Sequence, residues 1–125
     1  MTINPDKVWK MYFGNSPKAI DAFGYEIIKD EYANNYNNSK KGAWTLDHIF
    51  PKNPLNDNSK IKRYGWNHLY NIQPLSIKSN RIKESKLNGK VNNITFAIKI
   101  IEQNGNKVIG RMMIKKKGVW YWAYG

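Results

Sequence analysis

One short stretch of the chain holds residue types that hydrolytic chemistry uses. Asp47 and His48 are adjacent, and His48 is one of only two histidines among 125 residues. An imidazole with an ordinary pKa near 6.5 can take a proton from water at neutral pH, and a carboxylate oxygen can bind a divalent ion. Both functions serve phosphodiester hydrolysis. An Asp-His pair can equally be a structural hydrogen-bonded pair, so the surrounding motifs decide between the two interpretations.

Three short elements are predicted to position these side chains. Residues 44–49 have the pattern of a short strand, residues 69–75 predict a second strand, and a helix follows that carries Asn80. Proline lacks the amide that a strand ladder needs, and serine and glycine favour the two ends of a helix. The predicted boundaries are Pro51 for the first strand, Pro74 for the second, Ser76 or Ser79 for the helix start and Gly89 for its end.

Taken in order, the segments DHIFP, NIQPL and SNRIK resemble the three motifs of the HNH nucleases, whose shared core is the ββα-metal finger. The upstream segments DAFGYEI and GAWTLDH extend the resemblance to about half of the chain. Two departures stand out. The chain has no cysteine, so the structural zinc of many relatives is not expected, and residues 52–65 replace the Gly-Gly that often follows the first motif.

The resemblance implies a role for each motif residue. His48 would be the general base, and Asp47 and Asn80 would bind one divalent ion, most readily Mg²⁺ with Mn²⁺ as a substitute. Asn71 is the remaining catalytic-motif residue; it has no proton to offer, so it would brace the loop that aims His48. The expected products are a 5′ phosphate and a 3′ hydroxyl. His68, the other histidine, is expected to be structural.

The net charge of +12 is concentrated after residue 31. Such a field attracts the backbone of nucleic acids, and double-stranded DNA is the partner that the resemblance favours. The same abundance of Lys, Asn and Ile would also follow from an AT-rich genome without any binding function. The cations expected to contact phosphates are Lys52, Lys62, Arg63, Lys78, Arg81, Lys83, Lys86, Arg111, Lys115, Lys116 and Lys117.

The rest of the sequence predicts an α+β protein with one domain in three segments: a mostly helical part over 1–42, the core over 43–90 and a basic β extension over 91–125. The first part predicts a helix over 6–12, a further helical turn over 18–23, a strand or helix near 25–28, and a mobile loop over 34–41.

The C-terminal segment alternates as a β meander does. Asn104-Gly105 predicts a hairpin, and residues 119–124 predict a third strand; a helix over 93–102 is the alternative. Trp120, Trp122 and Tyr124 would share a face, which either packs on the domain or offers a base-stacking platform. Packing is the simpler expectation.

The function expected is that of a metal-dependent DNA endonuclease, and the alternative is a non-catalytic basic nucleic-acid-binding protein. No apolar run suits a membrane span or a signal segment, so the sequence predicts a soluble, cytoplasmic protein. One small site makes one nick per encounter, which leaves a homodimer open. Sequence specificity, the choice between nicking and double-strand cleavage, and a setting such as restriction, phage packaging, homing or toxicity are also left open.

Overall fold

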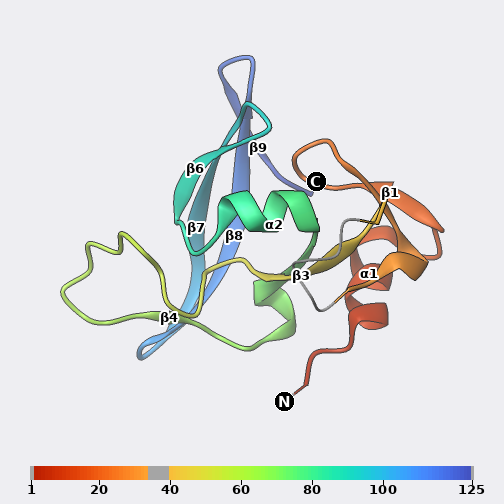
Figure 1. The fold of residues 1–125 in the computed structure, drawn as a ribbon. Helices are drawn as coiled ribbons and strands as arrows, with labels where there is room; N and C mark the ends of the chain where they lie inside the picture. The colour runs from red at the N-terminus through yellow and green to blue at the C-terminus, as the bar shows by residue number, and fades with distance from the viewer. Residues whose placement is uncertain (1, 34–39, 125) are drawn as a thin grey trace.

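The structure is a computed structural model that describes residues 2–33 and 40–124. Most of the loop predicted over 34–41 lies outside these residues. The described part is a mixed α+β fold, as the sequence predicts. Figure 1 shows the short helix α2 and the strand β3 on one side of a sheet made by the C-terminal half of the chain.

The N-terminal helix α1 spans Pro5–Phe13 and confirms the predicted one. The Asn4 side chain accepts a hydrogen bond from the Asp6 amide at 2.9 Å, and Gly14 ends the helix with a φ of 62°. The helical turn predicted over 18–23 is wrong. Residues 18–20 are instead the first strand of a hairpin, and residues 21–24 form its turn. The prediction of a mostly helical part over 1–42 is therefore wrong for its described residues, because one helix is followed by a hairpin and a short 3₁₀ turn.

The hairpin consists of β1 (Lys18–Ile20) and β2 (Glu26–Ile28), followed by the 3₁₀ turn η1 (Lys29–Glu31). The Asp21 carboxylate accepts hydrogen bonds from the Phe23 and Tyr25 amides, both at 3.0 Å. These bonds close the turn between the strands, which is a side-chain effect that hydrophobic spacing does not reveal.

The strand, strand, helix order predicted for the middle of the chain is present. Strand β3 (Trp44–His48) pairs antiparallel with β5 (Ile72–Ser76), and α2 (Ile77–Lys83) follows directly. The 3₁₀ turn η2 (Leu69–Asn71) occupies the first part of the predicted second strand.

Two predicted boundaries are wrong. Pro74 lies inside β5 opposite Leu46, because this sheet has two strands and a missing amide on its free edge costs no ladder bond. The helix ends at Glu84, whose φ is 54° and whose amide donates to Asn80 O. Gly89 lies in the following strand.

The C-terminal sheet has the order β4-β8-β7-β6, with β9 paired to β8. The hairpin at Asn104-Gly105 and the third strand are confirmed, and the alternative helix over 93–102 is wrong. A bulge at Ile100/Glu102 interrupts the β7 and β8 register. The strands are β4 (Tyr64–Gly65), β6 (Asn88–Val91), β7 (Ile94–Asn104), β8 (Lys107–Lys116) and β9 (Val119–Trp122).

The core lies between this sheet and the β3, β5 and α2 unit. Phe96, Met112 and Ile114 from the sheet belong to one buried cluster with Ile49 and Leu75. A second cluster joins three residues: Trp9 of α1, Ile27 of β2 and Trp44 of β3. Burial of such large apolar side chains stabilises the unit, and the chain has no cysteine that could form a disulfide.

Candidate active site

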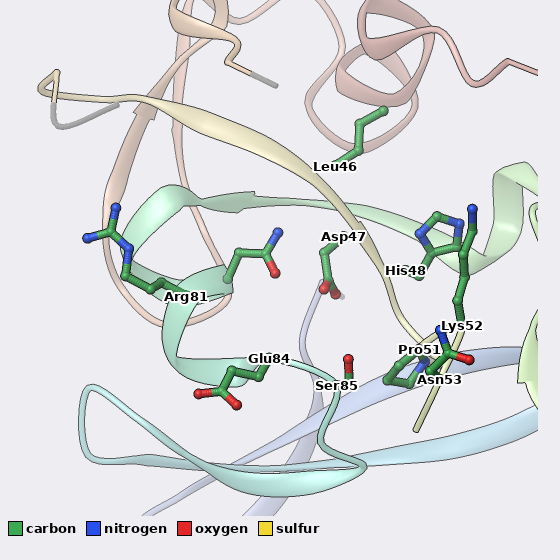
Figure 2. A pocket seen from close by; sticks show the side chains of 10 residues that line it. Leu46, Asp47, His48, Pro51, Lys52, Asn53, Arg81, Glu84 and Ser85 are labelled. Carbon is green, nitrogen blue, oxygen red and sulfur yellow. The ribbon is translucent and has the colours of Figure 1, made fainter. Parts of the chain in front are cut away.

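The motif residues Asp47, His48 and Asn80 line one hollow of about 430 Å³. β3 supplies the first two and α2 supplies the third, so the hollow lies where the strand ends beside the helix. Figure 2 shows Asp47 between β3 and α2, and Lys52 beside the His48 ring. The hollow is lined by Leu46, Asp47, His48, Pro51, Lys52, Asn53, Asn80, Arg81, Glu84 and Ser85.

Asp47 is buried, with 5% of its surface exposed, and it is held by an ion pair. The Lys83 ammonium lies 3.3 Å from Oδ1 and 3.2 Å from Oδ2, and Gln73 Nε2 donates to Oδ2 at 2.9 Å. Burial raises the pKa of the Asp47 carboxyl, while Lys83 and Gln73 act in the opposite direction. The Asp47 carboxylate therefore lies at a strand end and is held there by two buried side chains.

Lys83 itself has no exposed surface, so its predicted role as a phosphate contact is wrong. Its ammonium also lies 3.5 Å from the His48 carbonyl oxygen. A buried ammonium needs a counter-ion because burying an unpaired charge costs several kcal/mol. Lys83 is thus the counter-ion of Asp47.

His48 is partly buried and is oriented by a loop residue. Its Nε2 lies 3.2 Å from Asn67 Oδ1. Burial lowers the pKa of the imidazole, the Asn67 bond raises it, and the Lys52 charge lowers it further; the net direction is downward. With Nε2–H donating to Asn67, the neutral ring has its lone pair on Nδ1, where it can accept a proton.

Asn80 is buried to 6% exposure, and its Nδ2 has no hydrogen-bond partner among the described residues. An unpaired buried amide is costly, so a partner is expected there. A half-turn of the side-chain amide exchanges its nitrogen and oxygen. The amide oxygen of Asn80, on α2, can therefore face the hollow that Asp47 also lines, as a possible metal ligand.

Asn71 is fully buried, and its side chain makes four hydrogen bonds. Oδ1 accepts from the Phe50 amide at 3.0 Å and from the Gly110 amide at 2.8 Å, while Nδ2 donates to the carbonyls of Phe50 and Trp66. These bonds brace the segment that follows His48. The side chain has no exposed surface, so Asn71 acts on the site through this loop and not by touching a substrate.

Gly65 completes this brace by its close approach to the same segment. Its amide donates to Pro51 O at 2.8 Å, and a Cβ on Gly65 would overlap Phe50 O. The backbone around residues 50–51 can therefore lie only against a glycine.

A second buried carboxylate, Asp21, ties the first hairpin to the motif helix. Its Oδ2 accepts hydrogen bonds from the Ser76 amide at 2.9 Å and from the Ser79 hydroxyl at 2.7 Å. Ser76 is the N-cap of α2 and accepts from the Ser79 amide. Asp21 thus fixes the start of the helix that carries Asn80.

Comparison with protein-family models, with curated proteins and with solved structures finds no match for this chain. The resemblance therefore has only the three motifs and their geometry to support it. No group of three or more His, Asp or Glu side chains that could hold a metal occurs in the described part of the chain. In the same residues, no helix is long and apolar enough to cross a membrane.

The predicted phosphate-contacting cations are divided between three places. Lys52 and Arg81 line the hollow, and Lys52 and Lys62 line a neighbouring depression with Lys107. Lys78 is exposed on α2 over the Tyr25 ring, and Lys86 is half-buried with its ammonium 3.4 Å from Ile82 O. A third group is exposed along the second half of β8 and in the turn after it, and consists of Arg111, Lys115, Lys116 and Lys117.

Arg63 differs from the other loop cations because it is already paired. Its guanidinium donates to Asp57 through Nε at 3.0 Å and through the second nitrogen at 2.6 Å, and it lies over the Phe50 ring. This bidentate pair folds the 53–63 loop back on itself. The geometry assigns Arg63 to the loop and not to a phosphate.

Sequence reasoning missed three residues that hold the site together. Gln73 lies within the NIQPL segment, directly opposite Asp47 in the strand register, so the strand pairing could have indicated it. Asp21 is the first residue of the DAFGYEI segment, which resembles a segment of the HNH nucleases, but this resemblance does not indicate its hydrogen bonds to Ser76 and Ser79. Asn67 is in an irregular loop, and no pattern in the sequence points to it.

Proposed function

We propose that the chain is a metal-dependent nuclease that hydrolyses phosphodiester bonds of DNA. The observation that carries this proposal is the meeting of Asp47, His48 and Asn80 in one hollow. These residues come from separate motifs, and the same spacing in sequence is what resembles the HNH nucleases. The paired strands followed by a helix are consistent with a ββα-metal core.

His48 would take the proton from the attacking water. Its lowered pKa keeps the ring neutral at pH 7, and the Asn67 contact leaves Nδ1 as the basic atom. Lys52, beside the ring, adds a positive charge that attracts a phosphate to the same place. The products would be a 5′ phosphate and a 3′ hydroxyl.

The donor set fits a divalent ion such as Mg²⁺. Asp47 and the amide oxygen of Asn80 would hold it, and the unpaired Asn80 amide supports this use of the side chain. When bound, such an ion stabilises the charge that develops on the phosphate. Lys83 would compete for Asp47 oxygens, so the affinity for the ion should be low without DNA.

The Asp47 carboxylate already has two partners, Lys83 and Gln73. This observation favours a second candidate function, that of a non-catalytic DNA-binding protein derived from a nuclease. In that case the ion pair would be a permanent structural contact. Both candidates predict DNA binding, and only the first predicts metal-dependent nicking.

A plasmid-nicking assay with and without Mg²⁺ separates the two. The wild type should nick supercoiled DNA with Mg²⁺ and not with EDTA, and His48→Ala should lower the rate by about 10² to 10⁴. The matched control is His68→Ala, because His68 lies outside the hollow and accepts a local hydrogen bond from the Tyr70 amide at 3.1 Å. Nicking that survives in His48→Ala, or its absence in a folded wild type, would reject the nuclease proposal.

A further inference from the structure

The sheet face that points away from the hollow exposes two tryptophans. Trp120 and Trp122 on β9 have 40% and 38% of their surface exposed. The face was expected to pack on the domain, but only Tyr124 does so, through bonds to Pro74 O and to the Ala22 amide. Large aromatic side chains left in solvent side by side mark a binding surface.

A positively charged side chain lies over the ring of each exposed tryptophan. The Arg111 guanidinium lies 4.1 Å from the Trp122 ring centroid, and the Lys115 ammonium lies 5.8 Å from that of Trp120. The register of β8 and β9 explains both contacts. Lys115 is directly opposite Trp120, and Met113 is opposite Trp122. Arg111 lies two residues before Met113 on the same face of β8, so it is the diagonal neighbour of Trp122. The two pairs therefore form one continuous surface, which we name the Trp-cation face.

Within residues 2–33 and 40–124, Trp120, Trp122 and Lys115 remain exposed, and Arg111 is exposed while also bordering a small depression with Tyr12 and Gln73. The alternate residues of β8, Met112 and Ile114, point into the core with Ile49 of the motif unit. Figure 1 shows α2 and β3 on that side of the sheet. Because neighbouring residues of a strand point to opposite faces, Arg111, Lys115 and their tryptophans lie on the other side.

The charge of this region selects an anionic partner. Residues 88–124 contain one acid, Glu102, close to the far turn of the β7 and β8 hairpin. Lys99 is opposite Arg111 in the register and is also exposed. A surface that combines planar aromatic rings with cations and lacks acids suits a chain of phosphates that carries stackable bases.

We propose that the Trp-cation face binds single-stranded nucleic acid, with bases stacked at Trp120 and Trp122 and phosphates held by Arg111 and Lys115. A duplex hides the faces of its bases in its own stack, so it could use only the cations. This surface lies across the sheet from the hollow and does not depend on the nuclease proposal. It would hold an unpaired strand while a second nucleic-acid segment occupies the hollow.

The test measures fluorescence anisotropy of labelled oligo(dT), oligo(U) and a duplex of equal length, in EDTA to prevent cleavage. Each of Trp120→Ala and Trp122→Ala should weaken single-strand binding by about fivefold to a hundredfold. Tyr121→Ala is the matched control, because Tyr121 is 51% exposed on the opposite face of the same strand. It should change the affinity by about twofold at most. Duplex binding should be little affected by any of the three.

The variants Trp120→Phe and Trp122→Phe guard against misfolding, since phenylalanine keeps a stacking ring on the edge strand. They should retain most of the affinity, and each should lose the part of the oligo(dT)-quenched emission that comes from the replaced tryptophan. Equal losses in Tyr121→Ala and the tryptophan variants, or equal binding of duplex and single strand in all of them, would overturn the proposal. So would capture by anionic phospholipid vesicles without any binding of oligonucleotide. Tryptophan-dependent binding of either oligo(dT) or oligo(U) supports the proposal.

Discussion

Asp21 and Asp47 are almost equally buried, at 4% and 5% exposure, but the two regions around them satisfy the carboxylate in different ways. Asp21 accepts from three backbone amides and one hydroxyl, all of which the fold holds in place. Asp47 accepts from two flexible side chains, Gln73 and Lys83, beside an open hollow.

The difference separates a structural carboxylate from an exchangeable one. Backbone amides cannot leave Asp21 without unfolding the turn and the start of α2. A side-chain ammonium can move away from Asp47 if another cation replaces its charge. Burial alone therefore does not distinguish the two carboxylates, whereas the kind of donor around each of them does.

The largest effect is expected when the Asp47 pair is removed. Asp47→Ala should abolish Mg²⁺-dependent nicking and also destabilise the fold by about 3 to 5 kcal/mol, because it leaves the Lys83 charge buried and unpaired. The double variant Asp47→Ala/Lys83→Met should recover most of that stability and none of the activity. Urea unfolding and the nicking assay, run on the same samples, measure the two effects. Full stability in Asp47→Ala alone would show that Lys83 does not depend on this carboxylate.

The next effect tests whether Mg²⁺ can replace the Lys83 ammonium at the Asp47 carboxylate. Lys83→Met removes the ammonium from Asp47, so Mg²⁺ should raise the melting temperature of this variant more than that of the wild type, since a ligand that binds only the folded state stabilises it. Thermal unfolding across a Mg²⁺ titration measures this. The same shift in both proteins would mean that Asp47 does not bind the ion.

Removal of the Asp21 carboxylate, which the fold holds through backbone amides, should lower stability. Asp21→Ala leaves several buried donors without an acceptor, and we expect a loss of at least about 3 kcal/mol in the free energy of unfolding. Asp30→Ala is the control, because Asp30 is exposed in η1 and should change stability by about 0.5 kcal/mol or less. A small loss in Asp21→Ala would place this turn outside the cooperative core.

A smaller effect should follow from the His48 partner. Asn67→Ala removes a bond that raises the pKa of His48, so the pKa falls further below 6.5. A base acts in its neutral form, so the acidic limb of the rate profile should lie below pH 6.5 in the wild type and at still lower pH in the variant. The maximal rate should fall by roughly tenfold because the ring is less well oriented. Single-turnover rates between pH 4.5 and 8 test this, and an unmoved limb would exclude the Asn67 contact.

The smallest effect is expected at a partly buried loop pair, Asp57 and Arg63. The Arg63 hydrogen bond lowers the pKa of Asp57, so the pair stabilises the fold above the ordinary pKa and loses that effect as pH falls through the folded-state value. Arg63→Gln should cost less than about 1 kcal/mol at pH 7. The difference should vanish in acid. A difference that persists there would show that packing on Phe50 matters more than charge.

The sequence predicts the elements better than the contacts between them. The α1 helix, the strands β3, β7, β8 and β9, and the start of α2 follow from local caps, alternation and the Asn-Gly turn. The β1 and β2 hairpin was missed because the Asp21 carboxylate closes it by hydrogen bonds that no periodicity encodes.

The candidate site follows the same rule. Motif spacing indicated Asp47, His48 and Asn80, since each lies at the end or start of a predicted element. It could not show that Lys83 points inward, because a lysine in the last turn of a helix is exposed in most proteins. It also could not predict that Trp120 and Trp122 remain in solvent, which depends on where the sheet meets the core.

The bonds of Asn71 have a consequence for how the chain is made. Its side chain joins the segment after His48 to Trp66 and to Gly110, so the hollow takes its shape only when β8 is in place. A ribosome adds residues in order, from the N-terminus. All three motifs are complete by Lys83, yet the loop behind His48 lacks its last anchor until Gly110 has been synthesised. The nascent protein thus carries Asp47, His48 and Asn80 during part of its synthesis before the loop behind His48 has its last anchor.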